Sequence, residues 1–172
     1  MSPCAELERV YDAHASALFA FLLNLTRSES DTRDLLQEVY IRLARRPEWL
    51  AGVENERHFL LRLAHNLVVD LARRRTARER RQERYGSEWV GLFAPGVDPD
   101  REIFARELNR ALGELPAEQR AVVHLKLWEG MTFEAIADAL EIPLNTAASR
   151  SRYGLDKMRE RLRPFYDEIK QA

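Results

Sequence analysis

Apolar residues recur at helical spacing along this chain, and that pattern constrains its fold more than any other feature. Near the N-terminus, Leu7, Tyr11, Leu18 and Leu22 follow one another at intervals of four or seven residues. Such intervals place side chains on one face of an α-helix, whereas a half-buried strand requires alternating apolar and polar residues. No segment of the sequence alternates in this way. We therefore expect an all-α fold.

Capping residues and prolines predict where the first helices begin and end. Ser2 and Pro3 are suited to start a helix that spans about residues 4–25. Ser28–Asp31 offers caps for a second helix, which Pro47 stops after residue 46. A third helix is expected from about residue 57. Its apolar stripe ends where an arginine-rich segment begins, so its last turns should project into solvent or onto a partner.

The segment 85–100 interrupts the helical pattern. It mixes glycine, proline, acidic and aromatic residues without periodicity, which is typical of a connection between domains. We expect two small helical domains, residues 1–85 and 102–172, joined by a flexible linker at residues 86–101. A fourth helix is expected to start at Asp98-Pro99.

The C-terminal domain contains the pattern of a helix-turn-helix. Thr132 can cap a short helix with Ile136 and Leu140 inward, and Pro143 ends the turn that follows. Asn145 or Thr146 is expected to cap the second helix, whose first turn would enter a DNA major groove. An ordinary helical hairpin is the alternative interpretation of this segment.

Charge is distributed unevenly, although the formal net charge of the chain is only -1. Residues 71–85 hold seven arginines and two glutamates. The planar guanidinium group suits phosphate oxygens, so this segment favours nucleic-acid binding over a merely solvated helix end. Asp31, Asp34 and Glu38 share one face of the second helix, which indicates a solvated surface or a docking face for a basic partner.

Several classes of function find no support in the sequence. The four histidines lack neighbouring carboxylates or cysteines at metal-ligand spacing, and Cys4 is the single cysteine. There is no glycine-rich phosphate loop and no serine or cysteine in a nucleophile motif. We expect no catalysis, no metal and no cofactor. No apolar run reaches the length of about 18 residues that a membrane span requires, and no leader precedes the first helix, so a cytoplasmic protein is expected.

Three motifs in order resemble the extracytoplasmic-function type of sigma factor, the promoter-recognition subunit of bacterial RNA polymerase. They are DTRDLLQEVYIRLARRP, RHFLLRLAHNLVVDLARRR and the helix-turn-helix segment from LPAEQR onward. The resemblance implies binding to the polymerase core and to promoter DNA, with an anti-sigma protein as a further possible partner. The implied core contacts are Asp34, Leu35, Gln37 and Glu38. The implied minus-ten contacts are Phe59, Asn66, Asp70, Arg73 and Arg74. The implied minus-thirty-five contacts are Thr146, Ser149, Arg150, Arg152 and Tyr153.

The sequence departs from the family pattern at positions that matter for DNA binding. Phe59 stands where tryptophan is usual, and Ala148 stands where the family often has a basic residue. Glu141 occupies a turn position that is often glycine, so a non-glycine residue is expected to adopt a positive φ there. The promoter sequence therefore does not follow from the resemblance.

Two other functions are compatible with parts of the sequence. A stand-alone helix-turn-helix regulator would leave the acidic face and the arginine-rich segment without a role. A mimic that sequesters an anti-sigma protein would be expected to lack the DNA-binding set that includes Asn66 and Arg73, which this chain retains.

Overall fold

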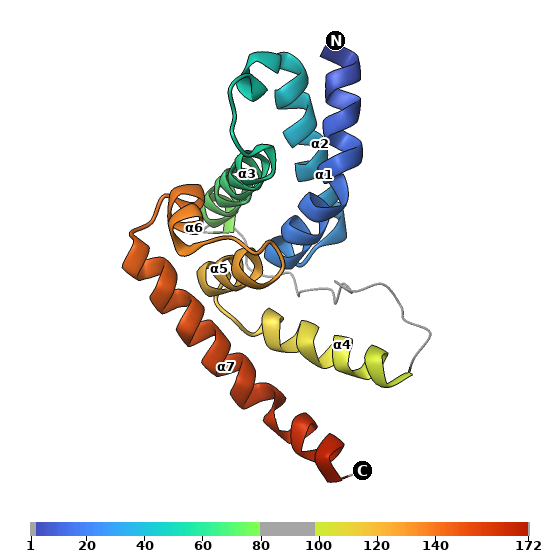
Figure 1. The fold of residues 1–172 in the computed structure, drawn as a ribbon, viewed down its shortest axis with the longest axis vertical. Coiled ribbons are helices and arrows are strands. Elements are labelled where there is room, and N and C mark those ends of the chain that lie inside the picture. Colours follow the sequence, from blue (N-terminus) through green and yellow to red (C-terminus); the bar gives the residue numbers. More distant parts are fainter. Residues whose placement is uncertain (1–2, 80–98, 172) are drawn as a thin grey trace. The chain divides into compact units, whose positions relative to one another are not determined.

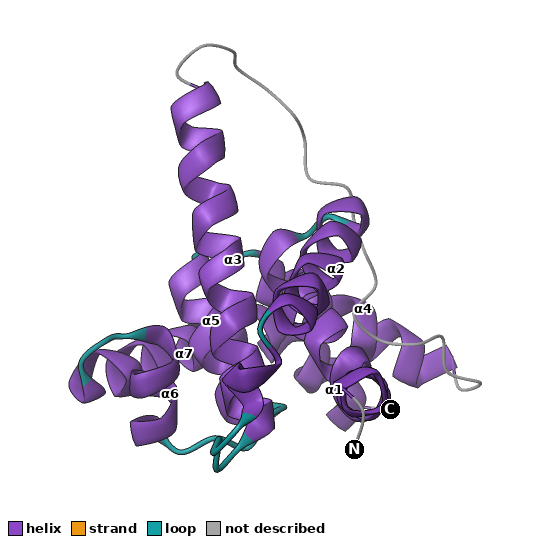
Figure 2. Ribbon diagram, turned by 90° about the horizontal axis from the view of Figure 1, so that it is seen from above, coloured by secondary structure: helices purple, strands orange, loops and turns teal. Residues whose placement is uncertain are grey.

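The computed structural model describes residues 3–79 and 99–171. The chain divides into two compact units, residues 1–90 and residues 91–172, and each is described by itself. All regular structure in the described residues is helical, with α-helices α1 to α7 and one short 3-10 helix, η1 (Figures 1 and 2). The expected all-α fold is confirmed.

The N-terminal unit is a bundle in which three long helices contact one another pairwise. Its elements are α1 (Pro3–Thr26), α2 (Glu29–Arg45), η1 (Pro47–Leu50) and α3 (Glu56–Glu79). The largest fully buried side chains of this unit come from all three long helices: Val10, Leu18, Phe21, Leu22, Val39, Leu43, Leu60 and Leu61. The helical spacing in the sequence thus supplies one shared core.

The predicted bounds of these helices agree with the structure to within about two residues, and Ser28 caps α2 by accepting a hydrogen bond from the Asp31 N–H. The expected cap at Ser2 lies outside the described residues. The connection between α2 and α3 is not entirely irregular. Its first residues form the single turn η1, and Pro47 favours that turn because its ring fixes φ near the helical value.

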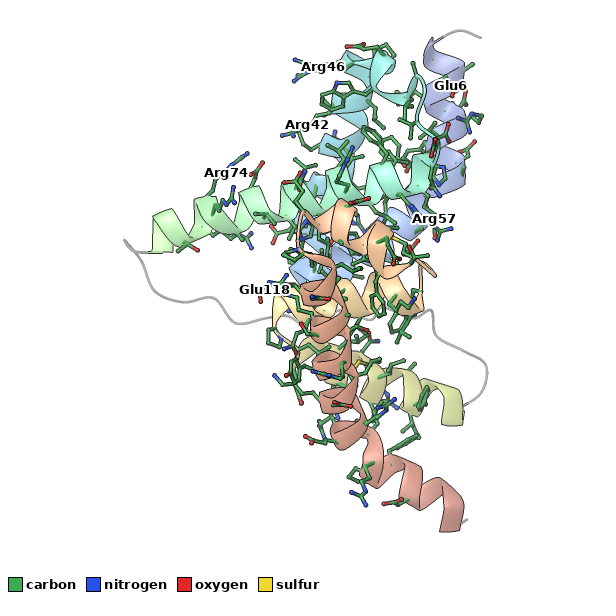
Figure 3. The ribbon with its side chains drawn as sticks, turned by 60° about the vertical axis from the view of Figure 1, so that its left-hand side comes forward. Glu6, Arg42, Arg46, Arg57, Arg74 and Glu118 are labelled. Atoms are coloured by element: carbon green, nitrogen blue, oxygen red, sulfur yellow. The ribbon has the colours of Figure 1, made fainter. Side chains whose placement is uncertain are left out.

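The last turns of α3 extend beyond the core of the bundle. Ala64 and Leu67 are buried, whereas all residues from 72 to 76 are exposed. In Figure 3, Arg74 lies on this extension. The expectation that the arginine-rich end of α3 leaves the apolar core is confirmed.

The C-terminal unit packs three shorter helices on one long helix. The short helices are α4 (Pro99–Gly113), α5 (Ala117–Leu127) and α6 (Phe133–Leu140), and α7 (Leu144–Gln171) contacts each of them. The core combines side chains of α4, α5 and α7, among them Leu112, Val123 and Met158. The helix start expected at Asp98-Pro99 agrees with α4, whereas residues 86–98 of the expected linker lie outside the described residues.

The start of α7 differs from the prediction. Asn145 or Thr146 was expected as its N-cap, but α7 begins at Leu144 and Thr146 is its third residue. The Pro143 carbonyl accepts hydrogen bonds from the N–H groups of Thr146 at 2.9 Å and Ala147 at 3.1 Å. Proline can occupy this place because a residue before the first helical turn needs no N–H donor of its own.

None of the helices in the described ranges is both long and apolar enough to cross a membrane.

Candidate nucleic-acid and partner-binding surfaces

The residues predicted for the minus-ten element lie along one side of α3. Phe59, Asn66 and Arg73 are spaced by seven residues, so they form a stripe along the helix, and Asp70 lies one turn from Asn66 on the same stripe. Asn66 and Arg73 are exposed, while Asp70 and Phe59 are partly buried. The structure therefore brings an amide, a carboxylate and a guanidinium group together on a surface that can meet a long, polar ligand.

Phe59 belongs to an aromatic and cationic cluster that the sequence did not predict. Its ring meets that of Trp49 edge to face at a centroid distance of 6.5 Å. The Arg62 guanidinium lies 5.6 Å from the Phe59 ring centroid, and that of Arg46 lies 5.3 Å from the Trp49 ring centroid. The three-residue spacing of Phe59 and Arg62 on one helix could have indicated the contact between these two side chains. The contact of Phe59 with Trp49 depends on where η1 packs.

The structure separates the arginines that appear equivalent in the sequence. Arg75 donates from Nη2 to Asp31 Oδ1 at 2.7 Å and so joins α3 to the first turn of α2. Within the described residues, Arg73 and Arg74 have no carboxylate at ion-pair distance. The arginines at positions 80, 81 and 84 lie outside the described residues, as does the side chain of Arg78. Among residues 72–76, Arg73 and Arg74 are therefore the available cations.

The acidic face predicted on α2 is only partly available to a partner. Asp34 and Gln37 are exposed, but Glu38 accepts a hydrogen bond from Arg42 Nε at 2.8 Å, and Asp31 is taken up by α3. Leu35 is 9% exposed, so its side chain packs in the core and does not face outward. The surface that remains available to a partner consists of the carboxylate of Asp34, the amide of Gln37 and the carboxylate of Glu38, which is paired with Arg42.

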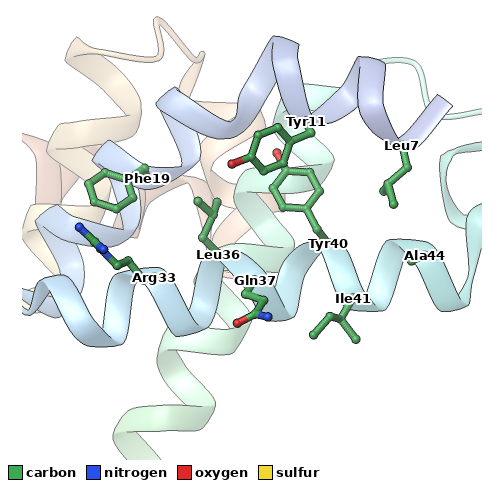
Figure 4. Close-up of a pocket in the computed structure, with 9 residues that line it drawn as sticks. All are labelled: Leu7, Tyr11, Phe19, Arg33, Leu36, Gln37, Tyr40, Ile41 and Ala44. Atoms are coloured by element: carbon green, nitrogen blue, oxygen red, sulfur yellow. The ribbon is translucent and has the colours of Figure 1, made fainter. Parts of the chain in front are cut away.

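A groove of about 660 Å³ lies between α1 and α2, next to Gln37 (Figure 4). Apolar side chains form most of its wall, and the rings of Tyr11 and Tyr40 lie within it in a tilted arrangement, with an interplanar angle of 55° and a centroid distance of 4.9 Å. Burial raises the pKa of Tyr40 to about 12. The Tyr40 hydroxyl is buried and has no hydrogen-bond partner among the described residues. The groove therefore offers an incoming partner mainly an apolar surface.

The turn of the helix-turn-helix has the geometry expected from the sequence. Thr132 caps α6 by accepting a hydrogen bond from the Ala135 N–H at 3.2 Å. Glu141 adopts a left-handed conformation with φ of 55°, which confirms the positive φ predicted at this position. The N–H of Ile142 donates to the Ala137 carbonyl at 3.0 Å, and that of Glu141 donates to the Asp138 carbonyl. These two bonds form a Schellman motif, which satisfies carbonyls at the end of α6 and reverses the chain.

The start of α7 has one buried and one exposed face. Ala147, Ser151, Gly154 and Met158 face the core. Arg152 and Tyr153 are exposed, whereas Thr146, Ser149 and Arg150 are partly buried.

The predicted contact residues on α7 also interact with one another. Ser149 Oγ donates to the Thr146 carbonyl at 3.1 Å, and the Arg152 guanidinium lies 5.0 Å from the Tyr153 ring centroid. No group of three potential metal ligands occurs within the parts of the chain that the structure covers.

Comparison with known proteins identifies both halves of the chain. Residues 10–78 match the family model described as Sigma-70 region 2, and residues 105–158 match the one described as Sigma-70, region 4. A relative is the ECF RNA polymerase sigma factor SigX of Bacillus subtilis, 27% identical over 165 residues, which are 93% of this chain and 85% of the relative. The ECF RNA polymerase sigma factor SigL of Mycobacterium tuberculosis H37Rv is 30% identical over 159 residues, 90% of this chain and 88% of that protein.

A solved structure has the same fold. It is the sigma factor RpoE of Bartonella quintana in complex with the anti-sigma factor NepR, with a TM-score of 0.81 and 18% identity over 92% of this chain and 97% of that chain. The family models match the two helical units in the expected order, and the curated relatives align over most of their length. The chain therefore belongs to the extracytoplasmic-function sigma factors of the sigma-70 family, and it functions as an RNA polymerase sigma factor in transcription initiation.

Proposed function

We propose that this sigma factor docks on bacterial core RNA polymerase through α2, contacts the minus-ten element with α3 and contacts the minus-thirty-five element with α7. The observation that carries the proposal is the stripe of Phe59, Asn66, Asp70 and Arg73, with Arg74 beside it on the exposed extension of α3. The protein acts by binding, without catalytic chemistry of its own, and it works in the cytoplasm, where its polymerase and DNA are found.

Different side chains on α3 have different tasks in this proposal. The amide of Asn66 and the carboxylate of Asp70 can exchange hydrogen bonds with base edges, which differ between bases. Arg73 and Arg74 bind phosphate oxygens, which are the same at every position and therefore set affinity without sequence preference. Phe59, beside Trp49, offers an apolar surface next to the loop 47–56, which we propose to hold a base flipped from the opened strand.

The core contact is proposed to combine Asp34, Gln37 and Glu38 with the neighbouring groove between α1 and α2. Carboxylates on the rim would attract a basic helix of the polymerase, and the apolar groove would supply buried area. Leu35 contributes from inside the bundle by holding α2 in place.

Charge reversal tests this contact. Asp34→Lys with Glu38→Lys should weaken binding to core by about tenfold or more, equivalent to ~1.4 kcal/mol, with unchanged far-UV circular dichroism. Glu134→Lys with Asp138→Lys is a matched control, because these exposed acids on α6 have the same spacing and undergo the same charge change. Equal co-purification of both double variants with core would place the contact elsewhere.

On α7, Ser149 and Arg152 can make opposite kinds of hydrogen bond with a base, since one can accept and the other can only donate. The Ser149 hydroxyl donates its proton to the Thr146 carbonyl, so in this arrangement its lone pairs are available as acceptors. Arg152 can only donate, and guanine offers the matching pair of acceptors in the major groove. Arg150 lies to the side and is proposed to bind phosphate. Arg152→Ala should relax the preference for one base of the upstream element, by about 1–3 kcal/mol at that base.

Run-off transcription tests the function as a whole. The full-length chain, mixed with purified bacterial core polymerase and a pool of genomic fragments, should yield transcripts from a subset of fragments that share two spaced elements. Core alone should yield none of them. A chain that binds DNA but never directs core to these fragments would instead be a stand-alone helix-turn-helix regulator. A chain that binds neither would be a mimic that sequesters an anti-sigma protein.

An anti-sigma protein remains part of the proposal, because the solved structure of the Bartonella relative contains one. The groove beside Tyr40 is a surface where such a protein could compete with the polymerase.

A further inference from the structure

Glu56, the first residue of α3, is held by two side chains of α1. Arg9 Nη2 donates to Glu56 Oε1 at 2.5 Å, and His14 Nε2 lies 3.4 Å from Glu56 Oε2. Arg9 also donates to Glu6 Oε1 at 2.7 Å, so a second carboxylate on α1 fixes the guanidinium in place. Both oxygens of Glu56 are therefore engaged by a helix that lies far away in the sequence.

The protonation states of the group favour a persistent contact. The Arg9 and His14 hydrogen bonds hold the pKa of Glu56 below its usual range, so Glu56 is a carboxylate at neutral pH. His14 Nδ1 is buried and has no hydrogen-bond partner in the described part of the chain. The neutral tautomer with the proton on Nε2 fits these surroundings, because its single donor then faces the carboxylate.

Glu56 stands where the connection between α2 and α3 ends. Asn55 caps α3, since its side-chain oxygen accepts from the His58 N–H at 3.0 Å and its carbonyl accepts from the Phe59 N–H at 3.1 Å. Earlier in the connection, the backbone hydrogen bonds of Ala51 and Val53 are local. Such bonds hold the shape of a loop but do not fix its direction relative to the bundle.

Three residues beyond Glu56, Phe59 meets Trp49 of η1. The start of α3 thus carries one half of the aromatic pair, and the loop carries the other. A displacement of the first turn of α3 would therefore change the orientation of the loop relative to Phe59, Asn66, Asp70 and Arg73.

We propose that Glu56, clamped by Arg9 and His14, is a positioning residue that fixes the loop 47–56, at whose end it stands, for the opening of promoter DNA. This inference rests on the proposed function of α3 and its preceding loop. Flipping a base out of a duplex costs a few kcal/mol, and a preformed site recovers more of that cost than a loop that must first become ordered. Glu56 itself does not touch DNA, and it acts through the residues that it orients.

The test compares Glu56→Gln with Glu8→Gln in holoenzyme reconstituted from the full-length chain. Glu8 is an exposed acid of α1, outside the loop and the stripe of α3, with no ion-pair partner in the described residues, so both variants lose one charge but only one loses the clamp. Strand opening is followed with a fluorescent base analogue in the minus-ten element. A second template carries the same promoter with that element already unpaired.

Glu56→Gln should slow opening of the duplex promoter by about two- to fivefold, the range expected from a partly exposed ion pair. On the unpaired template the defect should be much smaller, because the base no longer has to be unpaired before the loop holds it. Glu8→Gln should match the wild type on both templates. Arg9→Gln breaks the clamp from α1 and should reproduce the Glu56→Gln behaviour, so it decides the question if Glu56→Gln fails to fold.

Two results would overturn the inference. Equal opening rates for the Glu56→Gln and Glu8→Gln variants would show that the clamp has no role in promoter opening. An equal defect of Glu56→Gln on both templates would show a general loss of structure instead of a positioning role. In either case, wild-type holoenzyme that transcribes from the promoter leaves the proposed function intact, whereas wild-type chain that fails to do so contradicts the proposed function itself.

Discussion

Gly154 lies where α7 packs against Val123 of α5, and replacing it with alanine should reveal how tightly the C-terminal unit is packed. A Cβ atom at this position would lie 2.7 Å from Val123 Cγ2. Val123 is fully buried, and its branched side chain has little rotamer freedom in a helix. The methyl groups therefore cannot avoid each other without a shift of α7 or α5.

Two opposing terms decide the size of the effect. Alanine is favoured over glycine in a helix interior by about 1 kcal/mol, whereas overpacking of a dense core costs about 1–3 kcal/mol. We expect Gly154→Ala to lower the free energy of unfolding by up to about 2 kcal/mol. In a Val123→Ala background the clashing methyl group is gone, so the same substitution should raise the free energy of unfolding by about 1 kcal/mol.

Urea unfolding measures both effects, followed by Trp128 fluorescence in a chain whose Trp49 and Trp89 are replaced by phenylalanine. Only the C-terminal unit is then monitored. The expected signature is a change of sign for Gly154→Ala between the two backgrounds. Stabilisation by Gly154→Ala in the Val123 background would mean that α5 and α7 yield easily, and the reasoning from the 2.7 Å contact would be wrong.

Three further predictions concern other residues. Glu141→Gly should raise the free energy of unfolding by about 0.5–1 kcal/mol, because glycine accepts a positive φ at lower cost. Glu141→Ala should give no gain in the same urea assay. Arg73→Ala with Arg74→Ala should weaken holoenzyme binding to all promoters alike and flatten the salt dependence of the affinity by about two counterions. The lowered pKa of Glu56 stabilises the fold above the pKa of the unfolded chain, near 4.5, and this contribution is lost as the pH falls through the folded value. The stability difference between wild type and Glu56→Gln should therefore shrink in thermal melts as the pH falls below about 4.5.

Local signals in the sequence predicted the helices and several details of their ends. Ser28, Thr132 and Pro47 act within one turn of their own position, so their effect on the chain does not depend on its distant parts. The positive φ of Glu141 was predicted from the family resemblance, in which this turn position is often glycine, and the structure confirms it. The apolar pattern alone does not distinguish Tyr153 from Gly154 as the inward residue of α7, since neighbouring residues on a helix differ in direction by only about 100°.

Contacts between distant residues could not be predicted in the same way. Arg75 meets Asp31 across 44 positions, and Arg9 meets Glu56 across 47. The sequence does not distinguish the arginines of the run from one another, because the packing of α3 on α2 determines which of them meets a carboxylate. The groove beside Tyr40 likewise depends on the separation of α1 and α2, although the sequence placed Tyr40 correctly on the buried face.

The pairing of Arg75 explains how a chain with a net charge of -1 can present a directional cationic surface. Arg75 is nine residues beyond Asn66, which is half a turn away around the helix, so Arg75 lies opposite the stripe proposed to contact bases. Asp31 neutralises it there, while Arg73 and Arg74 keep their full charge on or beside the stripe. Charges separated by more than about 8 Å are largely screened at physiological ionic strength, so a phosphate close to residues 73 and 74 responds more strongly to these two arginines than to the paired Arg75. An unpaired Arg75 would make the extension of α3 attractive to DNA from both sides, and the duplex could then bind in orientations that keep Asn66 away from the bases.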